Sequence, residues 1–170
     1  MWADISYTAQ RSVGEARIGD FSTHLISARL EYITGPQKFR VGMSRTDESG
    51  GIKKPYGNPA NYLSIIINDF DRAGEDAVTV GYSLDMGQVG PGRLSFFANM
   101  VWGDTPDTGP IASPDANEFD LTVDWRLNQG WSEKLWVRLR AAWVNQDDAY
   151  PKSDDLFDFR IIVNYDFNLL

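Results

Sequence analysis

The chain has 170 residues, of which 16 are basic and 24 acidic, giving a formal net charge of -8 at pH 7. This acidic balance argues against a nucleic-acid partner, which requires a basic surface. The absence of cysteine excludes thiolate metal sites, a cysteine nucleophile and disulfides, and with His24 as the only histidine we expect no metal and no cofactor.

Apolar and polar residues alternate along most of the chain, and a period of two is typical of a β-strand with two unlike faces. No segment combines an apolar 3.6-residue period with helix caps, so the sequence predicts an all-β, antiparallel meander. In chain order, the predicted strands are Trp2–Gln10, Phe21–Ile33, Lys38–Arg45, Asp76–Met86, Leu94–Gly103, Glu118–Asn128, Leu135–Gln146 and Asp158–Leu170.

The connections between these strands alternate in length along the chain. An up-and-down sheet would therefore have all its short turns at one end and all its long loops at the other, as outer-membrane barrels do. We expect one β-barrel domain over residues 1–170, with 46–75 as its longest loop. The short connections are 34–37, 87–93 and 129–134, the long ones are 46–75, 104–117 and 147–156, and 11–19 is intermediate.

The apolar files suggest which face meets lipid. No apolar run is long enough for a transmembrane helix, but the best strands keep an apolar file over about 9–11 residues, which spans a bilayer when tilted. Aromatic residues recur near strand ends, as in the girdles at membrane interfaces. We therefore expect the apolar face to meet lipid and the charged face to line a watery lumen. The aromatic residues are Tyr7, Tyr32, Trp102, Trp125, Trp143, Tyr165 and Phe167.

Alternation alone also agrees with a soluble, lipocalin-like barrel that binds an apolar ligand. In that protein the charged file would be the solvated outer face, and Phe119, Leu121, Val123 and Trp125 would point inward. An enzymatic barrel is a third hypothesis, but it needs a nucleophile with a base. His24 lies in an apolar file and no Ser-His-carboxylate set is apparent, so we expect no enzyme.

Several stretches resemble a known family. They are LISARLEYITGPQKFRVGMSR (Leu25–Arg45), the segment Tyr62–Asp104, LWVRLRAAWV (Leu135–Val144) and FRIIVNYDFNLL (Phe159–Leu170). In this order they resemble the C-terminal part of OprD-type outer-membrane porins, the outer-membrane carboxylate channels, over nearly the whole chain.

The resemblance implies a transmembrane barrel of eighteen strands in the bacterial outer membrane, present as trimers or monomers. This chain would supply about eight of those strands, either open or closed as a small barrel. Because no signal peptide begins the sequence, the expectation is a C-terminal fragment or truncated reading frame.

The implied function is passive diffusion of small polar solutes, such as amino acids and small carboxylates, through a charged lumen in contact with outer-membrane lipid. Guanidinium groups suit carboxylates because they form bidentate hydrogen bonds. The same arginines would alternatively pair with Asp120, Asp124 and Asp158 as wall structure, which leaves the sign of the selectivity open. The candidate pore-lining residues are Arg29, Arg40, Asp120, Asp124, Arg126, Arg138, Arg140 and Arg160.

In the family, the loop equivalent to 46–75 folds inward and forms part of the constriction. The resemblance makes its polar residues constriction candidates, namely Ser64, Asn68, Asp69 and Asp71. The alternative is that this segment is an extra short strand or a packed surface loop.

Overall fold

The computed structural model describes residues 1–15, 19–54, 57, 59–130, 133–147 and 155–167. It contains one antiparallel sheet whose strand order follows the chain from β1 to β8. Within the described residues no helix is long and apolar enough to cross a membrane. The strands are β1 (Trp2–Arg11), β2 (Ser22–Thr34), β3 (Gln37–Thr46), β4 (Asp76–Val89), β5 (Gly92–Asp104), β6 (Ala116–Leu127), β7 (Leu135–Gln146) and β8 (Leu156–Tyr165).

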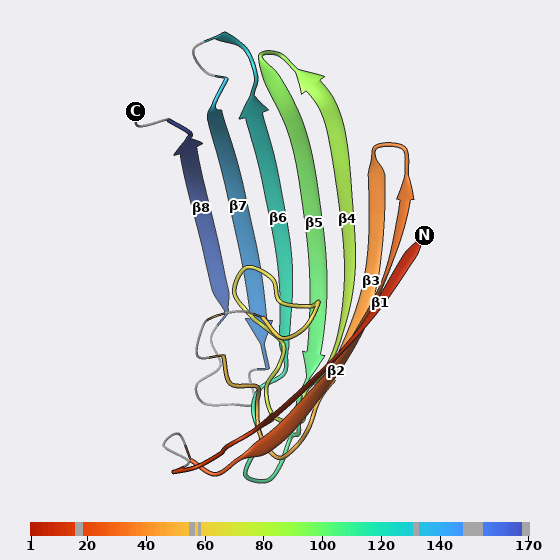
Figure 1. Ribbon diagram of the computed structural model, residues 1–170, viewed down its shortest axis with the longest axis vertical. Coiled ribbons are helices and arrows are strands. Elements are labelled where there is room, and N and C mark those ends of the chain that lie inside the picture. The colour runs from red at the N-terminus through yellow and green to blue at the C-terminus, as the bar shows by residue number, and fades with distance from the viewer. Residues whose placement is uncertain (16–18, 55–56, 58, 131–132, 148–154, 168–170) are drawn as a thin grey trace.

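The sheet is curved like part of a barrel wall, with β1 and β8 at its two edges (Figure 1). Neither edge pairs with the other among the described strands, so the alternative of a closed eight-stranded barrel is wrong. The predicted strands match the observed ones, except at the last. That strand begins at Leu156 and ends at Tyr165, and positions 168–170 of the predicted strand lie outside the described residues.

Two tight turns have the same chemistry. Gly35 and Pro36 join β2 to β3, and Gly90 and Pro91 join β4 to β5. The glycines have φ of 54° and 60°, which glycine adopts at no steric cost and which two-residue hairpins require. Both Gly-Pro pairs therefore fix the register of the hairpins that they connect.

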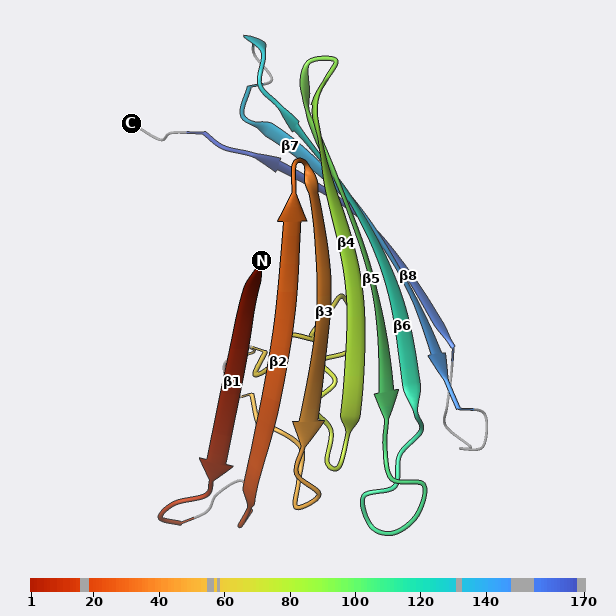
Figure 2. The same cartoon turned by 90° about the vertical axis from the view of Figure 1, so that its right-hand side faces the viewer.

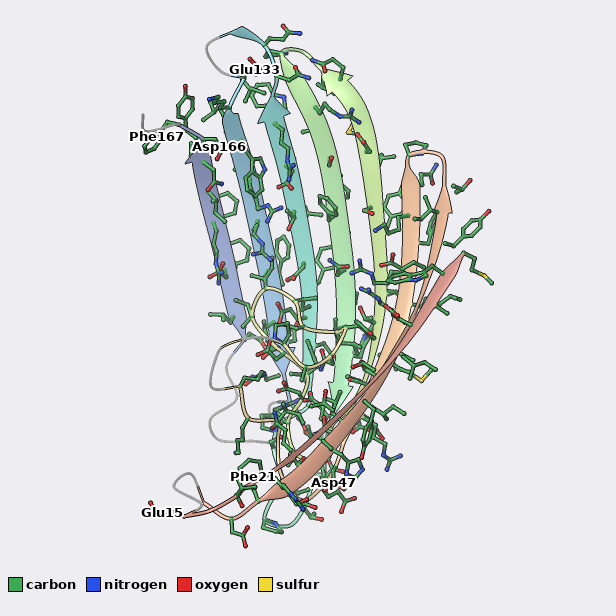
Figure 3. The ribbon with its side chains drawn as sticks, in the orientation of Figure 1. Glu15, Phe21, Asp47, Glu133, Asp166 and Phe167 are labelled. Atoms are coloured by element: carbon green, nitrogen blue, oxygen red, sulfur yellow. The ribbon has the colours of Figure 1, made fainter. Side chains whose placement is uncertain are left out.

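The long loops lie at one end of the sheet and the short turns at the other, as the alternation of loop lengths predicted (Figures 1 and 2). Figure 3 labels Asp47 at the long-loop end, and Glu133 and Asp166 at the short-turn end. Asp47 faces His24 there, with 3.6 Å between Nδ1 and Oδ2.

The apolar files form one exposed face that extends across the sheet, hereafter the outer face. Trp125 is the half-buried exception among the predicted girdle aromatics, and its Nε1 donates to the carbonyl of Val89 at 3.3 Å. Single exposed apolar residues are ordinary on soluble proteins, but a continuous exposed apolar face marks a surface that contacts a membrane or another protein. Exposed members include Ile5, Tyr7, Ile26, Tyr32, Phe39, Val41, Met43, Val78, Val80, Trp102, Phe119, Trp143, Phe159, Ile161 and Val163.

The opposite, polar face (hereafter the inner face) carries the buried core. Leu63 and Phe70 of the long loop pack there on Ala77 of β4 and Val101 of β5. The lipocalin-like alternative is therefore wrong about the direction of the faces. Phe119 is 38% exposed on the outer face, because the loop covers the polar side of the sheet and no part of the chain that the structure describes covers the apolar side at this residue.

Candidate functional site

A strap crosses the inner face of the sheet. We use this name for residues 59–72, the part of the long loop that Figures 1 and 2 show lying against the sheet from within its curve. Besides the apolar packing of Leu63 and Phe70 on β4 and β5, polar contacts join the strap to the sheet at two separate places, one on β2 and one on β6. The strap thereby joins strands that are four positions apart in the sheet.

At β2 the contact is made by Arg29. Its guanidinium carbon lies 4.3 Å from the centroid of the Tyr62 ring of the strap and 4.5 Å from that of Trp2 on β1. Asp4 also accepts a hydrogen bond from Arg29 Nη2 at 3.1 Å. A cation over aromatic faces is stabilised by the ring quadrupoles, so Arg29 fastens one end of the strap to the wall.

At β6 two carboxylates accept hydrogen bonds from the strap, an arrangement that we call the carboxylate latch. Glu118 accepts from the Ile67 amide at 2.7 Å and from both the amide and the side chain of Asn68 at 2.8 Å. Asp120 accepts from the Ile66 amide at 2.8 Å. Glu118 is 0% and Asp120 2% exposed, so these hydrogen bonds are made out of water, where hydrogen bonds are strongest.

The long loop has its own ion cluster. Lys54 Nζ lies 2.5 Å from both Asp69 Oδ2 and Asp71 Oδ2, and the Ser64 hydroxyl donates to Asp69 at 2.5 Å. Burial disfavours the charge on Lys54, but the hydrogen bonds to the two carboxylates outweigh it and raise the pKa of Lys54. Burial opposes ionisation of Asp69 too, yet its bonds with Lys54 and Ser64 lower its pKa.

Asp71 also contacts Lys54, but its pKa shifts in the opposite direction to that of Asp69. Burial raises the pKa of Asp71, and neighbouring Asp69 and Glu75 add to the rise. We attribute the difference from Asp69 to depth, because Asp71 is buried and Asp69 is half-exposed. Asp69 is therefore the better partner of the lysine charge.

The end of the strap is held by Arg72 and Glu75. The buried Glu75 carboxylate accepts from Arg72 Nη2 at 2.6 Å, and Arg72 Nη1 donates to the carbonyl of Pro114 at 2.6 Å. Gly103 of β5 leaves the room for this approach. A Cβ at Gly103 would lie 2.5 Å from Glu75 Oε1 and 2.7 Å from Phe70 Cδ1, so only glycine fits.

Besides Arg29, which pairs with Asp4, three of the predicted pore-lining arginines are engaged in ion pairs on the inner face. Arg138 binds Asp124 through two hydrogen bonds of 2.6 Å. Arg40 donates to Glu31 at 2.9 Å, and Arg160 to Asp158 at 2.6 Å. These contacts agree with the alternative in which the arginines are also part of the wall.

Arg126 and Arg140 differ from those three, because neither has an ion-pair partner among the described residues. Arg126 lies 4.9 Å from the ring centroid of Trp136. Arg140 stands opposite Thr122 and Arg160 on the neighbouring strands, and its Nε has no hydrogen-bond partner in the described part of the chain. Both guanidinium groups therefore have donors without a partner among the described residues.

The predicted constriction residues all lie on the strap. Asn68 contacts the wall, whereas Ser64, Asp69 and Asp71 contact Lys54 or one another. Whether they constrict a pore stays a prediction, as does the pore-lining role of the arginines and aspartates. The described residues contain no cluster of metal-ligating side chains.

Sequence reasoning missed Glu118, Glu75, Lys54 and Tyr62 as members of this arrangement. A signal for Glu118 was present, because it is in phase with Asp120 and Asp124 on the same face of one strand. The others sit in a loop, where a periodic pattern says nothing about which residues meet.

Comparisons with known proteins agree with this architecture. The chain superposes on three Pseudomonas aeruginosa structures, and at these identities the likeness shows the fold alone. They are OccK10 (OpdN; TM-score 0.82, 24% identity, 99% of this chain and 48% of that one), OccK3 (OpdO; 0.84, 22%, 96% and 43%) and OpdK with vanillate (0.85, 21%, 96% and 43%).

The chain spans less than half the length of each of these proteins. No curated protein matches it. The family described as outer membrane porin, OprD family, matches residues 1–169. That family consists of porins and not of enzymes. The chain therefore belongs to the OprD family of outer membrane porins.

Proposed function

We propose that this chain forms part of the wall of a passive channel through the bacterial outer membrane, and that small polar solutes diffuse along its inner face. Amino acids and small carboxylates are the solute class that we propose. The carrying observation is the difference between the two faces: the outer face exposes apolar side chains across the sheet, whereas the inner face holds charges and the strap. Charged files and an inward loop are the usual basis of selectivity in pores.

The arginines with unused donors support the carboxylate part of the proposal. Arg126 and Arg140 can offer a solute carboxylate guanidinium N–H groups, whereas Arg138 already gives two of its own to Asp124. OpdK, one of the similar structures, is described with vanillate, which is a carboxylate. In our proposal, the strap narrows the space along the inner face near Arg126 and Arg140, and a solute passes between the strap and these two arginines.

The test is electrical. The purified protein is inserted into a planar lipid bilayer, and the single-channel current and the reversal potential are measured under a salt gradient. Arg140→Glu should shift the reversal potential toward cation selectivity. Arg11→Glu is the matched control, because it makes the same charge change at an exposed residue that stands opposite Ser22 on the outer face. The absence of current, or equal shifts in both variants, would contradict the proposal.

A further inference from the structure

We propose that Glu118 and Asp120 are positioning residues that hold the strap against the wall, and that they are not solute-binding groups. Their role in narrowing a pore rests on the proposed function above. The positioning itself does not, because it follows from the contacts between strap and sheet alone.

The first argument is that the latch is reciprocal. The Glu118 carboxylate is fully buried and has no ion pair among the described residues. Its neighbours on the adjacent strands are Val101 and Val144, both buried and apolar. Among the described residues, the N–H groups that donate to it all belong to the strap. A buried charge without such donors is strongly unfavourable. The docked strap therefore stabilises the Glu118 carboxylate of the wall, and this carboxylate stabilises the docked position of the strap.

The second argument concerns the backbone of the strap. Within the described residues, the backbone of 61–71 makes no hydrogen bond with the backbone of a sheet strand. The amides of Ile66, Ile67 and Asn68 are satisfied by the latch. Since backbone donors away from water have to be paired, these three consecutive amides make the position of the strap specific to β6.

The third argument is chemical. Only an ionised carboxylate accepts three hydrogen bonds through two oxygens without presenting a donor. Glu118→Gln replaces one oxygen by an NH2 group, which then faces an N–H of the strap. The strap should therefore detach more often in this variant although the side chain keeps its size.

A thiol reporter tests this directly, because the chain has no cysteine. Leu63 is fully buried beneath the strap, so Leu63→Cys gives one thiol that a water-soluble reagent reaches only when the strap opens. Labelling rates are compared in lipid vesicles for Leu63→Cys alone and combined with Glu118→Gln. The matched control combines it with Asp158→Asn, which removes a carboxylate that pairs with Arg160 instead of the strap.

We expect labelling to be at least about tenfold faster with Glu118→Gln, and faster still when Asp120→Asn is added. The control should remain within about twofold of Leu63→Cys alone. Ile67→Pro is a second route, because it removes one donor from the strap and leaves β6 unchanged; it should accelerate labelling as well. Unchanged rates in both Glu118→Gln and Ile67→Pro would overturn the proposal.

Conductance then separates the latch from the proposed function. If the strap constricts a pore, the variants with fast labelling should also show a larger single-channel conductance. Fast labelling with unchanged conductance would retain the positioning role of Glu118 and refute the strap as a constriction. Slow labelling in every variant would refute the latch whatever the current.

Discussion

At the scale of single residues, two arginines of β7 that are two positions apart have different surroundings. Arg138 is bound to Asp124 by two short hydrogen bonds, and the Asp124 side chain is 5% exposed. Arg140 has no such partner in the described chain. The sequence places both arginines on the same face of the strand. Their different surroundings result from the register with β6, in which Arg138 lies opposite Asp124 and Arg140 lies opposite Thr122.

We predict that Arg138→Leu lowers the free energy of unfolding by about 3 kcal/mol, because it leaves the Asp124 charge buried and unpaired. Arg140→Leu should change stability little and shift the reversal potential instead. Denaturant titration in detergent micelles measures the first effect. The double variant Arg138→Leu/Asp124→Leu should regain most of the loss, since it removes the orphan charge. Equal destabilisation by Arg138→Leu and Arg140→Leu would contradict this account.

At the scale of an element, the long loop is held by charges whose protonation sets its stability. Because the pKa of Asp69 is lowered, its contribution to stability is present at pH values above its ordinary pKa of 3.8. This contribution is lost as the pH falls through the pKa of the folded state. Because the pKa of Lys54 is raised, its contribution to stability is present at pH values below its ordinary pKa of 10.5. This contribution is lost as the pH rises through the pKa of the folded state. Asp71 opposes them, because burial raises its pKa and makes its ionised form costly.

We therefore predict that Lys54→Met lowers the melting temperature most at neutral pH and less below pH 3.8 or above pH 10.5, the ordinary pKa values of Asp69 and Lys54. Near neutral pH, the free energy of unfolding should fall by about 1 kcal/mol or less, because Asp69 is half-exposed and water screens its ion pair with Lys54. Thermal melts across pH measure it. Lys53→Met is the matched control, since Lys53 has no carboxylate partner among the described residues and instead lies near the Phe21 ring. A loss that is independent of pH would rule out the ion cluster as its cause.

At the scale of the whole molecule, the two faces of the sheet should respond differently to the same charge. Val80 on the outer face of β4 stands opposite Met100 of β5, and the next pair along the ladder is Gly81 with Asn99. Asn99 lies on the inner face, opposite Asp120 on β6. Val80 and Asn99 are therefore at nearly the same depth and on opposite sides of the wall.

We predict that Val80→Lys destabilises the protein in lipid by about 2–4 kcal/mol, which is the cost of a lysine facing the bilayer midplane. Asn99→Lys should be tolerated, because its ammonium group faces Asp120. Unfolding by denaturant in phospholipid vesicles compares the two. Equal losses would show that the outer face is not in contact with lipid.

The alternation of side chains was enough to predict the eight strands, because a strand has a period of two. The antiparallel meander predicted their order. The direction of the two faces needed the length of the apolar files and the aromatic residues near strand ends, because alternation alone also agrees with a soluble barrel. It did not predict the strap contacts. Arg29 meets Tyr62 and Glu118 meets Asn68 across more than thirty residues of sequence, through a loop that has no period. Of the predicted constriction residues, only Asn68 touches the wall in this way, because Lys54 engages Asp69 and Asp71 within the loop.

The position of the strap also bears on how the wall acquires its shape. The strap contacts β2 and β6, two strands that do not pair with each other, and so it fixes the distance between them across the curved sheet. The curvature of the sheet between them is then set by contacts inside this chain. The part of the sheet from β2 to β6 should therefore keep its curvature for as long as the strap stays bound.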